Sequence, residues 1–71
     1  GEFEKALLYL ERAMELESTD PIVNDHLGDV LWMLGRKREA QFQWKKSLSF
    51  KPEPVDQKNT EDKLTFGLNH R

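Results

Sequence analysis

The side chains that could do chemistry are few in this sequence, and they form no catalytic or metal-binding pattern. The two histidines, His26 and His70, lie far apart in the chain, and there is no cysteine. The H-E-x-x-H pattern of zinc hydrolases and a glycine-rich phosphate loop are absent, and no motif places a base near a serine or threonine. We therefore expect no enzymatic activity, no metal, no cofactor and no small-molecule substrate.

Charged side chains segregate along the chain. Residues 1–31 hold eight acidic and two basic residues, whereas residues 32–51 hold six basic residues and one acidic residue. This asymmetry favours electrostatic steering of a partner or head-to-tail contact between copies, although charged helix faces are usually only solvated. The basic segment includes Phe42 and Trp44, so a nucleic-acid-binding helical domain is an alternative. Helical spacing turns Trp44 to the core, and the acidic front repels a polyanion, so we expect no nucleic-acid partner.

The apolar residues recur every three or four positions, which predicts an all-α fold. We expect helices at about 2–17, 21–34 and from 36 until Pro52 and Pro54, and a weaker fourth helix from 55 or 56 to 68. Asp20 before Pro21 is a strong helix start, and Gly35 suits a left-handed cap. Short connections imply antiparallel packing. No apolar run approaches the roughly 20 residues that cross a bilayer, so we expect no membrane insertion.

An internal repeat relates the first helix to the third. A shift of 34 residues lays small residues on small ones and large apolar residues on large apolar ones. The pairs are Gly1 with Gly35, Ala6 with Ala40, Leu10 with Trp44, Ala13 with Ser47, Met14 with Leu48 and Leu16 with Phe50. A period of this length built from two helices is typical of helical repeat proteins.

Residues 21–54 resemble the tetratricopeptide repeat, whose pattern is W-x2-L-G-x2-Y, then A-x3-F, then P. The spacing fits without a gap, and the matching residues are Asn24, Leu27, Gly28, Leu31, Ala40, Trp44 and Pro52. Asn24, Leu31 and Ser47 depart from the usual tryptophan, tyrosine and late alanine. The resemblance implies that Gly28 and Ala40 lie where two helices approach closely, that Trp44 fills the remaining volume and that Gly35 makes the turn. The segment from Leu34 to Ala40 is similar in sequence to bacterial members of the tetratricopeptide family.

The resemblance also implies a division of the chain. Residues 1–20 would be the second helix of a truncated repeat whose first helix precedes Gly1, and residues 21–54 a complete repeat. Residues 55–71, where the pattern fails, would be a C-terminal capping helix that buries Leu64, Phe66 and Leu68, with a frayed tail from Asn69. The sequence leaves the compartment open.

The expected function is that of a tetratricopeptide scaffold for protein–protein interaction, which binds a peptide or partner protein on its concave face. The first helix of each repeat lines that face in the family, and the matching residues are Ile22, Asp25, His26, Asp29, Trp32 and Met33. An acidic pair beside a tryptophan and a methionine suits a basic, partly apolar peptide. The charge of Asp25 and Asp29 is wrong for the family's clamp on C-terminal carboxylates.

Two alternatives remain open. Trp32 and Met33 could instead pack against a helix upstream of Gly1. The chain could also self-associate as a homodimer through the open repeat face, because Phe3, Leu7 and Leu10 lack a covering helix on one flank.

Overall fold

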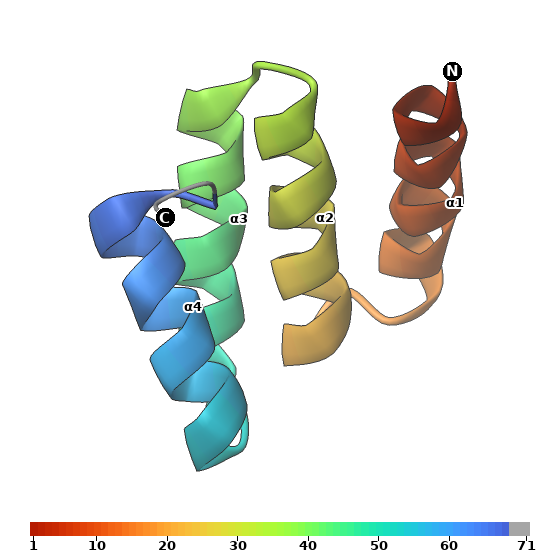
Figure 1. The fold of residues 1–71 in the computed structure, drawn as a ribbon. Helices are drawn as coiled ribbons and strands as arrows, with labels where there is room; N and C mark the ends of the chain where they lie inside the picture. The colour runs from red at the N-terminus through yellow and green to blue at the C-terminus, as the bar shows by residue number, and fades with distance from the viewer. Residues whose placement is uncertain (69–71) are drawn as a thin grey trace.

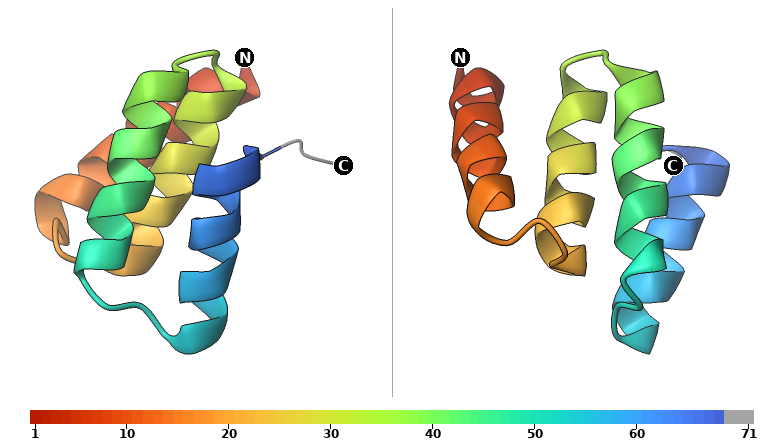
Figure 2. Two further views of the ribbon diagram at one scale, coloured as in Figure 1. Left: turned by 90° about the vertical axis from the view of Figure 1, so that its left-hand side faces the viewer. Right: turned by 180° about the vertical axis from the view of Figure 1, so that it is seen from behind.

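The computed structural model describes residues 1–68 and contains four α-helices in that range, which confirms the all-α prediction (Figure 1). They are α1 (Glu2–Leu16), α2 (Pro21–Met33), α3 (Lys37–Ser49) and α4 (Pro54–Phe66). Each helix packs antiparallel against its neighbour in the chain, so α1 and α3 flank α2, and α4 lies against α3 (Figure 2). None of the helices in residues 1–68 is long and apolar enough to span a membrane.

The predicted signals at both ends of α2 are confirmed. The Asp20 side chain accepts a hydrogen bond from the Ile22 amide at 2.8 Å, and Pro21 occupies the first turn. At the other end Gly35 has φ +82°, its amide donates to the Trp32 carbonyl, and the Arg36 amide donates to the Leu31 carbonyl. This pair of bonds is the Schellman arrangement, which a residue at positive φ permits and glycine adopts without strain.

The end of the third helix was predicted less well. The helix stops at Ser49, and Lys51 turns the chain at φ +56° before Pro52 is reached. Pro54 does not end this helix; it occupies the first turn of α4, where its missing amide hydrogen costs nothing. The fourth helix therefore starts one or two residues earlier than expected.

The apolar core lies between α2 and α3. It consists of Leu27, Leu31, Ala40 and Trp44, and Trp44 and Ala40 are completely buried. A Cβ atom at Gly28 would overlap the Trp44 indole and lie 3.1 Å from the Ala40 carbonyl oxygen. The predicted close approach of these two helices at Gly28 is thus confirmed.

Three polar residues are buried beside this core, and each donates a hydrogen bond. Asn24 donates from Nδ2 to the carbonyls of Ser18 and Asp20, and Ser47 donates from Oγ to the Pro21 carbonyl at 2.7 Å. The two bonds of Asn24 hold the segment before α2, and the bond of Ser47 holds the first residue of α2. Positions 24 and 47, where the chain departs from the tetratricopeptide pattern, are therefore occupied by polar anchors that fix the start of α2.

Helix α4 buries different residues from those predicted. Leu64 and Leu68 are partly buried against the core, but Phe66 is 62% exposed, so the prediction that Phe66 is buried was wrong. Thr60 is fully buried instead. Residues 60, 63, 64 and 67 recur at helical spacing on the inner face, which turns position 66 outward. The predicted frayed tail, Asn69 to Arg71 with His70, lies outside the described residues.

Candidate partner-binding surface

The predicted acidic pair of α2 is bound by a lysine from α4. Lys63 Nζ lies 3.0 Å and 3.2 Å from the two carboxylate oxygens of Asp25, and 2.9 Å and 3.0 Å from those of Asp29. The three side chains are largely shielded from solvent, with exposed fractions of 17% for Lys63, 16% for Asp25 and 29% for Asp29. One ammonium therefore bridges two carboxylates that lie one helical turn apart.

Two further donors complete this network. Thr60 Oγ1 donates to Asp25 Oδ1 at 2.7 Å. Trp44 Nε1 donates to Asp29 Oδ1 at 3.1 Å and to the Asp25 carbonyl at 3.2 Å. The largest core side chain and the polar contact between α2 and α4 are thus joined at Asp29.

The network shifts the pKa values of two of its members. Burial raises the pKa of Asp29 and outweighs the hydrogen bonds from Lys63 and Trp44, which act in the opposite direction. Burial by itself would lower the pKa of Lys63, but the hydrogen bonds and negative charges of Asp29 and Asp25 raise it overall. Pairing prevails for Lys63 because its ammonium faces two carboxylates, whereas Asp29 shares that one ammonium with Asp25.

An open groove runs between α2 and α4 beside this network and encloses about 460 Å³. Both helices contribute polar side chains, and Leu68 adds an apolar wall. The lining residues are Asp25, His26 and Asp29 from α2 and Asp56, Asn59, Asp62 and Lys63 from α4, together with Leu68. Four aspartates and one lysine leave the lining with a net charge of −3, so the groove is acidic even after Lys63 is counted.

The structure brings only part of the predicted surface to this groove. Asp25, His26 and Asp29 line it, whereas Ile22 and Met33, which are 40% and 41% exposed, lie toward opposite ends of α2 and outside the lining. Trp32 packs its ring against Trp44 at a centroid distance of 5.5 Å and covers Gly67. Lys37 Nζ lies 4.9 Å from the centroid of the same ring. Trp32 thus connects α2, α3 and the end of α4.

The residues that α4 contributes were missed by the sequence analysis. The tetratricopeptide pattern fails from Val55 onward, so it places these residues in a cap and predicts no contact between them and α2. A usable signal was present, since positions 56, 59, 60 and 63 recur at spacings of three and four and hold Asp, Asn, Thr and Lys. That pattern places one polar stripe along the helix.

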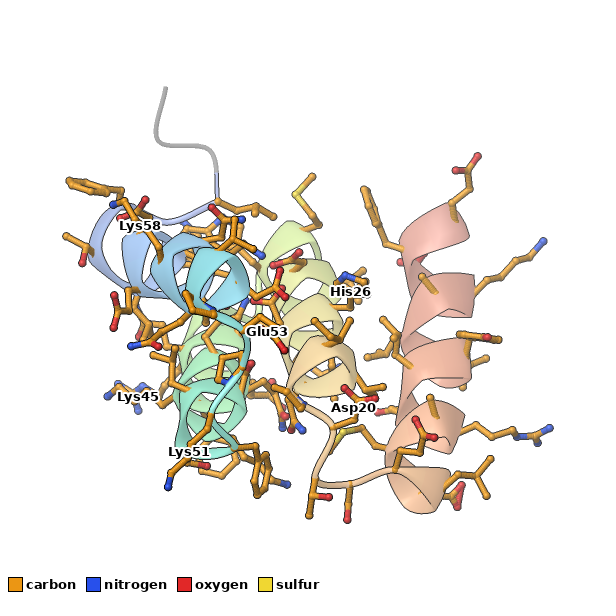
Figure 3. All side chains as sticks on the ribbon, turned by 90° about the horizontal axis from the view of Figure 1, so that it is seen from below. Asp20, His26, Lys45, Lys51, Glu53 and Lys58 are labelled. Carbon is orange, nitrogen blue, oxygen red and sulfur yellow. The ribbon has the colours of Figure 1, made fainter. Side chains whose placement is uncertain are left out.

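The outer face of α3 is basic. Arg38 and Lys45 are exposed, and Phe42 between them is 63% exposed. Lys45 projects from the side of α3 that faces away from α2 (Figure 3). Trp44 is completely buried, as its helical position predicted, so no indole is available on this basic face.

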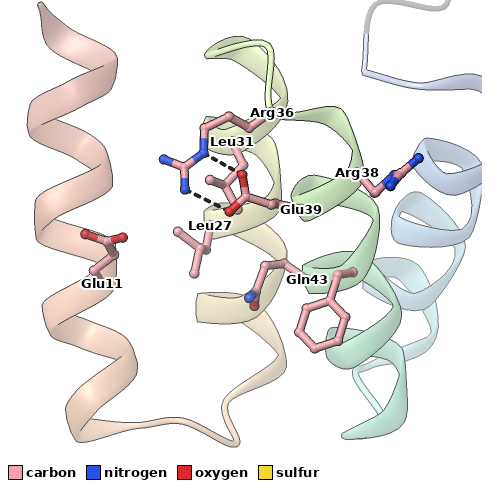
Figure 4. Close-up of a pocket in the computed structure, with 8 residues that line it drawn as sticks. Glu11, Leu27, Leu31, Arg36, Arg38, Glu39 and Gln43 are labelled. Carbon is pink, nitrogen blue, oxygen red and sulfur yellow. Dashed lines mark hydrogen bonds and ion pairs between the residues drawn. The ribbon is translucent and has the colours of Figure 1, made fainter.

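A second groove lies between α1 and α3, with Leu27 and Leu31 of α2 at its floor (Figure 4). Arg36 and Glu39 form a two-bonded ion pair on its rim, with N to O distances of 2.6 Å and 2.8 Å. Glu11 lies on the opposite wall. Arg38 and Phe42 of α3 also line this groove. Its two arginines and two glutamates give it a mixed charge, unlike the acidic groove between α2 and α4.

The remaining exposed apolar side chains belong mainly to α1. Leu8, Tyr9 and Leu16 are 68%, 76% and 82% exposed, and Phe3 is 44% exposed. Leu7, Leu10 and Met14 lie on the other side of this helix from Leu8, Tyr9 and Leu16, on the same stripe as Phe3, and pack against the core cluster. The helix therefore has a second apolar surface that nothing in residues 1–68 covers.

Comparison of the chain with protein-family models, with curated proteins and with solved structures finds no match.

Proposed function

We propose that this chain is a protein-interaction scaffold of the tetratricopeptide type, and that it binds a basic, partly apolar peptide in the groove between α2 and α4. The relationship to that family is supported by the spacing of Gly28, Ala40 and Trp44 and by their close packing. In such a scaffold α2 and α3 form one repeat, and α4 contributes a further helix to the same binding face.

The observation that carries the proposal is the composition of the groove. Asp56 and Asn59 are available to a ligand, and the ion pair of Asp62 with Lys58 is long, at 3.5 Å, and exposed. A lysine or arginine of the partner can therefore add to the groove without displacing Lys63. Leu68 offers an apolar contact next to these acids, which suits a partner that alternates basic and apolar side chains.

Peptide titration tests this proposal. The probe is a labelled peptide with lysine, arginine and leucine at helical spacing, compared with the same peptide in which glutamate replaces each basic residue. We expect the basic peptide alone to bind, and to bind more weakly as salt is added. The double variant Asp56→Asn/Asp62→Asn should weaken binding about threefold to tenfold, because each exposed charge contributes about 0.2–1 kcal/mol.

The matched control is Glu2→Gln/Glu15→Gln, which removes the same amount of charge from exposed positions on α1. It should leave peptide affinity within the error of the wild-type value. Equal affinity for the basic and acidic peptides, or equal losses in the two double variants, would remove the basis for a specific acidic groove.

Self-association through α1 is a second candidate, favoured by the exposure of Leu8, Tyr9 and Leu16. Apolar surfaces of this kind pair with copies of themselves, and the association depends little on salt. Sedimentation of the wild type and of Tyr9→Ser/Leu16→Ser tests it. A dimer that persists in high salt and is lost in the serine variant would favour this candidate, whereas a wild-type monomer at high concentration would dismiss it.

A further inference from the structure

The outer face of α3 has the chemistry that the acidic groove requires of a ligand. Arg38, Phe42 and Lys45 follow one another at spacings of four and three residues, which places them on one side of the helix. All three are exposed, and Phe42 is the most exposed aromatic side chain of α3. This face is basic at both ends and apolar in the middle, as is the partner inferred for the groove.

The cations of this face are unpaired. Among residues 1–68, no carboxylate forms an ion pair with Arg38, Lys45 or Lys46. Glu39, the only acid of α3, is held by Arg36. Arg38 and Phe42 line the second groove beside this pair, but Arg38 forms no ion pair with Glu39. The basic face therefore keeps its full charge, and the opposing acids at Asp56 and Asp62 remain accessible at the groove.

The two surfaces cannot meet within one molecule. The groove lies between α2 and α4, whereas Lys45 projects from the side of α3 that faces away from α2 (Figure 3). A rigid bundle with such short connections cannot bring them together. Complementary charges on different faces of one chain are instead suited to contact between two copies.

We propose that the occupant of the groove between α2 and α4 is the α3 face of a second copy, formed by Arg38, Phe42 and Lys45. This inference rests on the proposed function, because it uses the same groove. The contact is heterologous, so each copy offers one groove and one α3 face, and addition can continue from either end. It differs from pairing through α1 in that it is electrostatic and weakens with salt.

Two complementary variants test the proposal. Arg38→Glu/Lys45→Glu alters the α3 face and keeps the groove, whereas Asp56→Asn/Asp62→Asn weakens the groove and keeps the α3 face, without creating a basic groove that would attract the glutamate face. All four positions lie outside the core, and circular dichroism verifies that each variant has the wild-type helix content. At low salt we expect the wild type to form a series of oligomers in sedimentation velocity, and each variant alone to associate at least about threefold more weakly.

The decisive measurement is the mixture. The variant with the intact groove and the variant with the intact α3 face can form one native contact between them and no more. We therefore expect an equimolar mixture to give a 1:1 heterodimer that does not grow further and that dissociates in high salt. A mixture that stays monomeric overturns the inference, as does wild-type association that resists salt and persists in both variants, because that behaviour belongs to α1.

A peptide titration separates this inference from the proposed function. The Arg38→Glu/Lys45→Glu variant retains the groove and is titrated with the basic probe peptide. Peptide binding without a heterodimer would show that the groove takes basic segments other than α3, which overturns the inference and leaves the proposed function standing. Absence of both would overturn both.

Discussion

The indole of Trp44 lies directly against the backbone of Gly28, in the space that a Cβ atom at position 28 would occupy. This contact brings α2 and α3 together, and it leaves Trp44 Nε1 within hydrogen-bond distance of Asp29 and the Asp25 carbonyl. One glycine thus sets both the packing of the core and the position of the acidic pair in the groove.

Replacement of Gly28 should destabilise the protein, although alanine is the better helix former by about 1 kcal/mol. We expect Gly28→Ala to lower the free energy of unfolding by about 1–3 kcal/mol through overpacking against Trp44, and Gly28→Leu to lower it at least as much. Urea denaturation followed by circular dichroism gives the value. His26→Ala, at an exposed position of the same helix, is the control. A stability gain in Gly28→Ala would contradict the described contact.

The two glycines at positive φ offer a matched comparison. Gly35 has φ +82° and no neighbouring atom within 4 Å of its added Cβ, whereas Gly67 has φ +79° and a Cβ there would lie 2.7 Å from Trp32 Cζ2. Gly35→Ala should cost about 1 kcal/mol from backbone strain alone. Gly67→Ala should cost more, by about 1–2 kcal/mol, because the methyl group also displaces Trp32. Equal losses of thermal stability would mean that the contact with Trp32 is loose.

The hydroxyl of Thr60 should be worth more than that of Thr65 on the same helix. Thr60 is buried and donates to Asp25, whereas Thr65 is exposed and donates to the Glu61 carbonyl at 3.1 Å. We expect Thr60→Val to lower the free energy of unfolding by about 1–3 kcal/mol, since Asp25 loses a partner in a shielded site. Thr65→Val should change it little, and Thr60→Ser should retain most of the stability. A Thr60→Val variant as stable as wild type would rule out this role.

The pairing of Lys63 with Asp25 and Asp29 predicts a stability loss at high pH. The pKa of Lys63 is raised in the folded state, so its contribution is fully present below the ordinary lysine value of about 10.4 and is lost as pH rises through the folded pKa. Lys63→Met should cost about 2 kcal/mol at pH about 8, because two shielded carboxylates lose their cation. The difference between wild type and variant should then shrink above pH about 10.4. Urea midpoints across this range measure it, and a constant difference would contradict the assignment.

The sequence predicted the contact between α2 and α3 well because it depends on residue size at fixed spacing. Gly28, Ala40 and Trp44 fit together by volume, and a helical period transmits that information directly. The start of α2 was equally predictable, since Asp20 and Pro21 act through local backbone chemistry.

The candidate groove was predicted only on its α2 side. Asp25 and Asp29 lie on one face of α2, which the helical period predicts. The helix that binds them is α4, and the whole of α3 separates the two helices in the sequence. Nothing in the period of α2 indicates that Lys63 and Thr60 lie opposite. The burial of Phe66 was predicted wrongly for a related reason. Helix α4 is so polar that the hydrogen bonds of Thr60 and Lys63 determine which of its faces turns inward, and the spacing of apolar residues does not reveal those bonds.

None of the residues of α1, all of which the structure describes, is fully buried. The helix is attached to α2 by partly buried side chains alone, among them Leu7, Leu10 and Met14, while α2, α3 and α4 share Trp44, Trp32 and the Lys63 network. Local opening costs least where few groups are buried. The amide hydrogens of α1 should therefore exchange with solvent deuterium well before those of α2 and α3, which makes the first helix a separate, weaker unit of unfolding beside a three-helix cooperative core.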